Sequence, residues 1–330
     1  MSHSLPPDRV PPTVTLDHLE LDSGECLAPV TIAYELTGPV DAPVVAVMGG
    51  ISATRHVASH AGDPAPGWWE PFVGAGKAVD TDQLRVLGMD FLGGNAATTG
   101  PRNSDGWPRA LTPGDQARCV ERLLDAQQID TLGCFIGSSY GGMVALQLAA
   151  QAPGRLHRAA VLGAAHRPPA MATALRCIQR EAVRAGLKNG QVRDGLRLAR
   201  AIGMATYRSN EEFETRFDPA PAPGEPLSFA VEDYLFSRGD AFADAFDPQA
   251  YLTLSSSIDS LRVEPERIGL PVHLLAFATD FVAPPTLMQE LEDRLTEGHL
   301  TTIPSIYGHD AFLKEEAAIS QWLQPILCNV

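Results

Sequence analysis

The serine at position 139 stands in a sequence pattern that can turn a hydroxyl group into a nucleophile. Residues 137–141 read Gly-Ser-Ser-Tyr-Gly, a Gly-x-Ser-x-Gly pentapeptide between an apolar run and an alanine-rich segment. In a tight strand-to-helix turn the two glycines let the backbone pack closely, which lifts the Ser139 hydroxyl clear of the sheet. The same turn aims the N–H of Tyr140 at a developing oxyanion. Ordinary Gly/Ser turns also produce this pentapeptide, so the presence of a base and an acid elsewhere in the chain decides whether Ser139 is a nucleophile. Ser138 is the competing serine, but it occupies the variable position of the motif.

Two further residues could complete the chemistry that a serine nucleophile requires. His309 lies between the last expected strand and the last expected helix, and Asp280 ends the expected strand before that. A histidine there can take the serine proton, and the aspartate can fix the histidine tautomer and stabilise the imidazolium. Taken singly, they are more ordinarily an exposed loop histidine and a turn aspartate. The chain order Ser139, Asp280, His309 is that of α/β-hydrolases, so we predict a catalytic triad.

An oxyanion needs a second N–H donor, which an early loop can supply. The segment Met48-Gly49-Gly50-Ile51-Ser52 follows an expected strand, and its glycines allow the backbone to approach a ligand closely. We expect the N–H of Ile51 to act with the N–H of Tyr140. The alternative is a simple Gly-Gly turn.

These residues must be positioned by strands that alternate with helices. Apolar and β-branched runs predict buried strands at Thr31–Leu36, Val44–Met48, Arg85–Phe91, Gly133–Gly137, Arg158–Gly163, Val272–Ala278 and Leu300–Ile306. Apolar residues at every third or fourth position predict helices at Pro113–Gln128, at Pro284–Leu295 and from about Asp310 to Leu323. The alternation predicts an α/β fold, a mostly parallel sheet flanked by helices, and with the serine motif an α/β-hydrolase fold.

The segment between these two blocks has a different pattern. From about His166 to Ile268 we expect helices at Met171–Ala185 and Gly190–Ala205, a proline-rich turn at Pro219–Pro226, and no buried strand. A helical stretch that interrupts a parallel sheet is typical of an insertion. We therefore predict a core domain of residues 1–166 and 267–330, with residues 167–266 forming a helical cap, or lid.

Composition and charge exclude several classes of partner. The 330 residues are 45% hydrophobic, and the formal net charge of −15 would repel nucleic acids and anionic membranes. No apolar run approaches the roughly 20 residues that span a bilayer, and residues 1–12 lack a signal-peptide core. The five cysteines have neither CxxC nor metal-ligand spacing. We expect reduced thiols, no metal and a cytoplasmic location.

Beyond these motifs, the chain resembles the homoserine O-acyltransferase family, which transfers acetyl or succinyl groups from coenzyme A to an amino-acid hydroxyl. The resemblance runs from about Thr31 to the final helix. Its most specific segments are Ser139–Met143, Ala174–Glu181, Thr206–Arg208 and Gly308–Leu313. Residues 50–53 stand where the family has its oxyanion loop.

The resemblance implies a ping-pong enzyme of methionine biosynthesis that uses acyl-CoA as co-substrate, L-homoserine as acceptor and no permanently bound cofactor. It implies that Arg208 binds the carboxylate of the amino acid and that Asp310 binds its ammonium group. This chemistry is reasonable, because a guanidinium forks onto a carboxylate and a carboxylate pairs with an ammonium. The alternatives are a helix-end arginine and an N-cap of the final helix. A homodimer is also implied.

Two features bear on the acyl donor. The turn of residues 137–142 that carries Ser139, here called the elbow, reads Gly-Ser-Ser-Tyr-Gly-Gly, whereas the family usually has Gly-Gly-Ser-Met-Gly-Gly. Residues 93–100 stand in place of a longer glycine- and serine-rich segment of the family. Between Arg167 and Arg208 there are nine Lys or Arg residues and two acids, which suits an anionic nucleotide or a solvated helix face. Acetyl and succinyl both stay open, and we favour succinyl. Serine as acceptor and hydrolysis by water are the alternatives; a non-catalytic scaffold is disfavoured because no triad member is missing.

Overall fold

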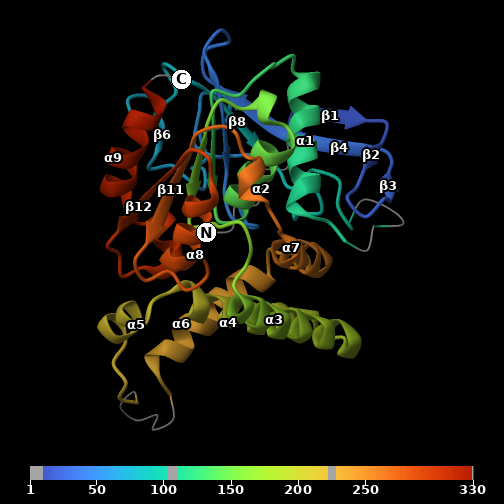
Figure 1. The fold of residues 1–330 in the computed structure, drawn as a ribbon. Helices are drawn as coiled ribbons and strands as arrows, with labels where there is room; N and C mark the ends of the chain where they lie inside the picture. The colour runs from blue at the N-terminus through green and yellow to red at the C-terminus, as the bar shows by residue number, and fades with distance from the viewer. Residues whose placement is uncertain (1–9, 103–106, 108–109, 222–227, 329) are drawn as a thin grey trace.

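One eight-stranded sheet runs through the molecule in the order β1-β4-β8-β5-β9-β10-β11-β12 (Figure 1). The strands are β1 Thr13–Leu16, β4 Val30–Thr37, β5 Val44–Met48, β8 Arg85–Met89, β9 Cys134–Ser138, β10 Ala159–Leu162, β11 Val272–Phe277 and β12 Gly298–Ile303. β1 and β4 pair in antiparallel fashion, as do β4 and β8, and the remaining pairs are parallel. The computed structural model describes residues 10–102, 107, 110–221, 228–328 and 330. The turn expected at Pro219–Pro226 lies mostly outside these residues.

The sequence located the buried strands but missed the edge of the sheet. Each of the seven expected strands is present and ends within three residues of its expected bounds. β1 was not expected because its side chains alternate between exposed and half-buried, so it contains no buried apolar run. Two short pairs were also missed, β2 Leu19–Glu20 with β3 Cys26–Leu27, and β6 Val73–Gly74 with β7 Val79–Asp80.

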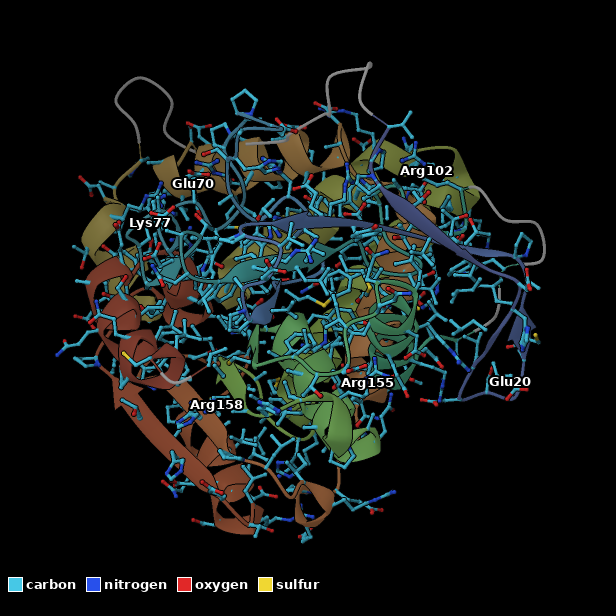
Figure 2. The ribbon with its side chains drawn as sticks, turned by 90° about the horizontal axis from the view of Figure 1, so that it is seen from above. Glu20, Glu70, Lys77, Arg102, Arg155 and Arg158 are labelled. Carbon is cyan, nitrogen blue, oxygen red and sulfur yellow. The ribbon has the colours of Figure 1, made fainter. Side chains whose placement is uncertain are left out.

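Helices cover both faces of the sheet. The side chains of β5 alternate between two apolar clusters, with Ala46 and Met48 on one face and Val45 and Val47 on the other. The first face packs against α1 Pro113–Ala126, α2 Tyr140–Gln151 and α8 Pro285–Arg294, and the second against α9 Glu316–Leu327. Seen from above, charged side chains such as Glu20, Glu70 and Lys77 lie around the rim (Figure 2).

The expected final helix from Asp310 to Leu323 is wrong in its first part. Gly308–Leu313 forms a 3₁₀ helix, and α9 begins only at Glu316. The buried Ala311 and Phe312 belong to the apolar cluster on the face of the sheet that α9 covers. Packing in the core therefore holds this turn, rather than the propagation of a helix. Asp310 is therefore not the N-cap of α9.

Among the described residues, five α-helices lie between β10 and β11 in the chain, and they gather below the sheet in Figure 1. They are α3 Ala170–Asn189, α4 Val192–Tyr207, α5 Asn210–Arg216, α6 Ala230–Ala243 and α7 Pro248–Ser260. The two helices expected here are confirmed as α3 and α4, and residues 167–221 and 228–266 contain no strand. The insertion has its own apolar cluster, which includes Val183, Leu196 and Tyr251, and Ile51 of the core packs against it. Among the described residues, no helix has the length and apolarity to cross a membrane.

Candidate active site

Ser139 occupies a strained turn between β9 and α2. Its backbone has φ 52° and ψ −118°, a conformation that residues with a side chain rarely adopt. A Cβ added to Gly137 would lie 2.4 Å from the carbonyl oxygen of Gly141, and one added to Gly141 would lie 2.1 Å from that of Met48. Both positions therefore require glycine, as expected from the motif. Ser138, the competing serine, is buried and does not line the cavity beside Ser139.

Ser139, His309 and Asp280 form one chain of hydrogen bonds. Nε2 of His309 lies 2.8 Å from Oγ of Ser139, and Nδ1 lies 2.8 Å from Oδ2 of Asp280. Because a carboxylate only accepts, Nδ1 carries the proton, which leaves the lone pair of Nε2 facing the serine hydroxyl. The structure thus brings together the three residues that the sequence singled out.

The electrostatic surroundings of His309 favour its charged form. Burial lowers the pKa of the imidazole, but the charge and hydrogen bond of Asp280 and the charge of Asp310 outweigh it, so the pKa is raised. Asp280 is itself fixed, because its Oδ1 accepts from the N–H groups of Val282 at 2.7 Å and Ala283 at 2.9 Å. The aspartate can thus stabilise a transient imidazolium without moving.

Two backbone N–H groups are free beside the nucleophile. Those of Ile51 and Tyr140 have no acceptor among the residues that the structure describes. Tyr140 is the first residue of α2, and Ile51 lines the same cavity as Ser139. The loop of Ile51 is attached to the elbow, since the N–H of Gly141 donates to the carbonyl oxygen of Gly49 at 2.8 Å. This arrangement can hold an oxyanion.

A cavity of about 210 Å³, here called the Ser139 cavity, lies between the elbow and the insertion. Its wall contains residues 50–53, Trp68, Met143 and His309 from the core, and Ile258 from the insertion. Three arginines and one acid also line it, namely Arg167, Arg176, Arg200 and Asp310. The nucleophile therefore faces a small space that is mostly apolar but carries charges of both signs.

Comparison with known proteins decides the family. The family model of the α/β-hydrolase fold matches residues 59–316. A homoserine O-succinyltransferase of Xanthomonas campestris pv. campestris is 40% identical over 289 residues, which cover 86% of this chain and 75% of that protein. The chain belongs to the homoserine O-acyltransferase family.

Solved structures agree with this membership. The homoserine O-acetyltransferase from Staphylococcus aureus has a TM-score of 0.83 and 27% identity, and the match covers 96% of this chain and 94% of that one. Esterase E22 has a TM-score of 0.87 at 22% identity, with 96% and 99% of the two chains covered. At that identity, the likeness to the esterase shows the fold alone.

The two residues expected to bind the amino acid lie side by side in this homoserine O-acyltransferase family member, but only one faces the Ser139 cavity. Asp310 lines it, and burial raises the pKa of this carboxyl even though Arg208 and Arg200 oppose the shift. Nε of Arg208 lies 3.0 Å from Oδ2 of Asp310, and its Nη1 donates to Glu212 at 2.6 Å. Arg208 lines a second, more open cavity, whose wall does not include Asp310.

Sequence reasoning missed the three arginines that line the cavity, among them Arg167, whose Nη2 donates to Glu290 at 2.7 Å. Arg176 and Arg180 hold the two oxygens of Asp259 at 2.7 and 2.6 Å, and only Arg176 reaches the cavity. Arg200 lies over the ring of Phe242 at 5.1 Å and has no carboxylate within 4.0 Å among the described residues. Arg167, Arg176 and Arg200 all lie in the arginine-rich stretch noted in the sequence. Helical spacing alone did not show which arginines of this stretch line the cavity.

Proposed function

We propose that this enzyme transfers an acetyl or succinyl group from acyl-CoA to the side-chain hydroxyl of L-homoserine. The observation that carries the proposal is the hydrogen-bonded series of Ser139, His309 and Asp280 at the wall of a cavity that also holds Arg200 and Asp310. The cavity therefore offers a nucleophile together with an acid and a cation that has no carboxylate within 4.0 Å among the described residues, which suits an amino-acid zwitterion.

In the first half-reaction, Ser139 attacks the thioester carbonyl while Nε2 of His309 takes the hydroxyl proton. The oxyanion of the tetrahedral intermediate accepts from the N–H groups of Ile51 and Tyr140. The intermediate collapses to an acyl-serine, and His309 returns the proton to the leaving coenzyme A sulfur. Asp280 stabilises the imidazolium that exists between these two proton transfers.

In the second half-reaction, His309 deprotonates the homoserine hydroxyl, which attacks the carbonyl of the acyl-serine. The tetrahedral intermediate collapses to O-acylhomoserine, and His309 returns the proton to the departing Ser139 oxygen. Asp310 holds the ammonium group of homoserine. Arg208, 3.0 Å from Asp310, binds its carboxylate once the amino acid enters between the two charges. Arg200 supports the same carboxylate, because it is a cavity cation without a carboxylate partner among the described residues.

The acyl donor is proposed to be succinyl-CoA. A succinyl group ends in a carboxylate, whereas an acetyl group ends in a methyl group, so a cation facing the acyl tail favours succinyl. Arg176 reaches the cavity from α3 and shares Asp259 with Arg180, so the three side chains carry a net positive charge. A free succinyl carboxylate could pair with this excess charge.

We propose that residues 167–266 act as a cap over a core of residues 1–166 and 267–330, excluding water so that transfer outcompetes hydrolysis. The cap also offers a surface for a homodimer, because Met171, Ile178 and Leu198 on α3 and α4 are 60%, 56% and 45% exposed. Met171 and Ile178 are seven residues apart and share a helix face. The free thiols and the coenzyme A thioester suit the cytoplasm.

A matrix of acetyl-CoA and succinyl-CoA against L-homoserine, L-serine and water tests the proposal. We expect O-succinylhomoserine as the dominant product, and little free succinate until homoserine is omitted. A serine O-acyltransferase would instead prefer L-serine. An esterase would release free acid at the same rate with or without an amino acid, and that result would overturn the proposal.

A further inference from the structure

The loop of residues 50–68 lines the Ser139 cavity at both of its ends. Ile51 lies at its start and Trp68 at its end, and both line the cavity. Two hydrogen bonds of Trp68 join the two ends of this loop. Its side-chain Nε1 donates to the carbonyl oxygen of Thr54 at 3.1 Å, and its backbone N–H donates to the carbonyl oxygen of His56 at 3.3 Å. These hydrogen bonds close the loop, the first of them within three residues of Ile51.

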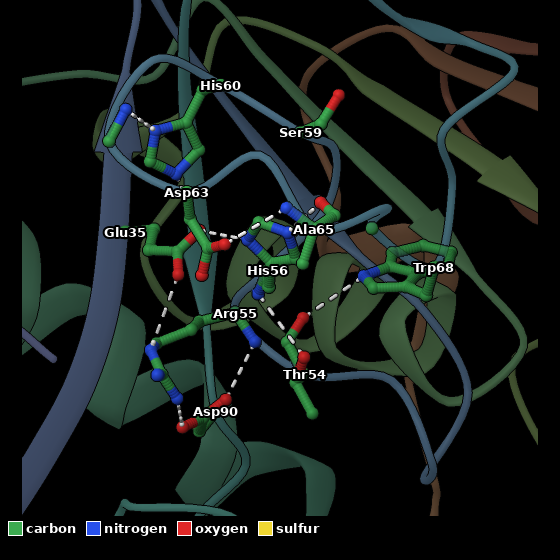
Figure 3. Close-up of polar contacts among 12 residues, drawn as sticks. Glu35, Thr54, Arg55, His56, Ser59, His60, Asp63, Ala65, Trp68 and Asp90 are labelled. Carbon is green, nitrogen blue, oxygen red and sulfur yellow. Dashed lines mark hydrogen bonds and ion pairs between the residues drawn. The ribbon is translucent and has the colours of Figure 1, made fainter. Parts of the chain in front are cut away.

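His56 lies inside this closure between two acceptors (Figure 3). Its Nδ1 is 3.0 Å from Oε2 of Glu35 on β4, and its Nε2 is 2.7 Å from the carbonyl oxygen of Ala65. A carboxylate and a carbonyl can only accept, so both ring nitrogens must donate, and His56 is an imidazolium. The hydrogen bond to Glu35, against the opposing effect of burial, raises the pKa of His56 to about 9.

Neighbouring charges hold the same stretch to the sheet. The backbone N–H and Nη1 of Arg55 donate to the two oxygens of Asp90, both at 2.7 Å, and Nε of Arg55 lies 3.7 Å from Oε1 of Glu35. Burial raises the pKa of Glu35, but His56, Arg55 and His60 prevail and lower it. The charged and titratable groups around His56 are therefore Glu35, Asp90, Arg55, His60 and Asp63.

Glu35, His56 and His60 are residue types that bind metal ions, but the protonation of the two histidine rings does not suit a metal. Ligand atoms of Glu35, His56 and His60 all lie within 4.8 Å of one another. The N–H of Gly62 donates to Nδ1 of His60 at 3.1 Å, so the proton of this ring is on Nε2, which is the atom that faces Glu35. With both nitrogens of His56 also protonated and Arg55 adjacent, the cluster presents protons and positive charge where a metal would need lone pairs.

We propose that His56, as an imidazolium bridging Glu35 and Ala65, is a positioning residue that holds the Ile51 N–H in place for the oxyanion. This inference rests on the proposed function, because it assigns that N–H to the oxyanion. The oxyanion exists only along the reaction path, so a displaced donor lowers the acylation rate more than it weakens binding. The imidazolium is present below its pKa and is lost as pH rises through about 9.

The test measures acylation of Ser139 by p-nitrophenyl acetate, which needs no acceptor, with Ser139→Ala as background. For the unaltered enzyme we expect the acylation rate to fall as pH rises through about 9. His56→Gln, which has no titratable ring, should acylate roughly 10–100-fold more slowly near neutral pH, with KM changed less than about two-fold and no such fall. His60 lies in the same loop, and Glu70 accepts from the N–H groups of Ser59 and Gly67 in that loop. Neither His60→Gln nor Glu70→Gln breaks the bridge, so both should stay within about two-fold of the unaltered enzyme.

Several results would overturn the inference. These are a His56→Gln rate equal to that of the unaltered enzyme, an alkaline fall that persists in the variant, or a rate that EDTA lowers and zinc restores. If His56→Gln does not fold, a flat profile between about pH 8 and 10 in the unaltered enzyme has the same meaning. An unaltered enzyme that does not acylate Ser139 contradicts the proposed function instead, so the two failures are distinguishable.

Discussion

Nε2 of His309 lies 2.8 Å from Oγ of Ser139, although 170 positions separate the two residues in the chain. The sheet produces this contact, because β9 ends at the serine and the parallel β11 and β12 lead to Asp280 and to the loop of His309. The described insertion helices lie in the chain between the serine and its partners, and α3, α4 and α7 among them contribute residues to the wall of the Ser139 cavity. The space beside Ser139 is therefore shaped by the core and by the insertion.

The strained backbone of Ser139 should cost stability. Ser139→Ala and Ser139→Gly both remove Oγ, but only glycine adopts φ 52° without strain. We expect both variants to be inactive and the glycine variant to have a free energy of unfolding about 1 kcal/mol higher than the alanine variant. Urea denaturation of the pair measures the difference. A less stable glycine variant would show that the turn is not strained.

The acid limb of the pH profile should report His309. The imidazole must be neutral to take the serine proton, so the acylation rate should rise as pH rises through its raised pKa. Asp310→Asn removes a charge that raises this pKa, so the limb should move to lower pH. Glu290→Gln, which removes the partner of Arg167 at the cavity, should leave it in place. A limb that stays or moves upward in Asp310→Asn would contradict this assignment.

Arg176 should govern the preference for the acyl donor. Arg176→Gln should lower kcat/KM for succinyl-CoA roughly 10–100-fold, the loss expected for a charged hydrogen bond, and should change that for acetyl-CoA less than about three-fold. Arg180→Gln disturbs the same Asp259 but does not reach the cavity, so it reports the structural effect alone. Equal losses with both donors in Arg176→Gln would remove this residue from donor selection.

The exposed face of the insertion should hold the dimer. Ile178→Asp should shift the enzyme toward monomer in analytical ultracentrifugation, since a charge would be buried at the interface. Val40→Asp, at an apolar position on the core that is still more exposed, 74% against 56% for Ile178, is the control and should not change the mass. A monomeric unaltered enzyme would refute the dimer.

Much of the architecture could be predicted from the sequence. Buried parallel strands are continuous apolar runs, and the elbow is a rigid local motif, so β5, β9 and β11 and the turn at Ser139 could be located within a few residues. The order of Ser139, Asp280 and His309 in the chain then predicted their proximity, because the carboxyl ends of parallel strands meet at one edge.

The remaining features depend on tertiary contacts that no local pattern reveals. The break after Leu313 follows from the burial of Phe312 in the core, not from helix propensity. Arg208 matched its expected motif but lines the second cavity, whereas Arg200, eight positions earlier, lines the Ser139 cavity. The partners of His56 lie on another strand and across a loop, so spacing gave no sign of them.

Mass spectrometry of the enzyme, intact and after digestion, tests the central claim most directly. The enzyme is mixed with succinyl-CoA, quenched, and compared with a sample to which L-homoserine is added before quenching. We predict the added mass of one succinyl group on the peptide that contains Ser139, its loss when homoserine is present, equimolar O-succinylhomoserine, and no adduct in Ser139→Ala. Rapid formation of O-succinylhomoserine by Ser139→Ala, or an adduct that homoserine does not discharge, would contradict the account.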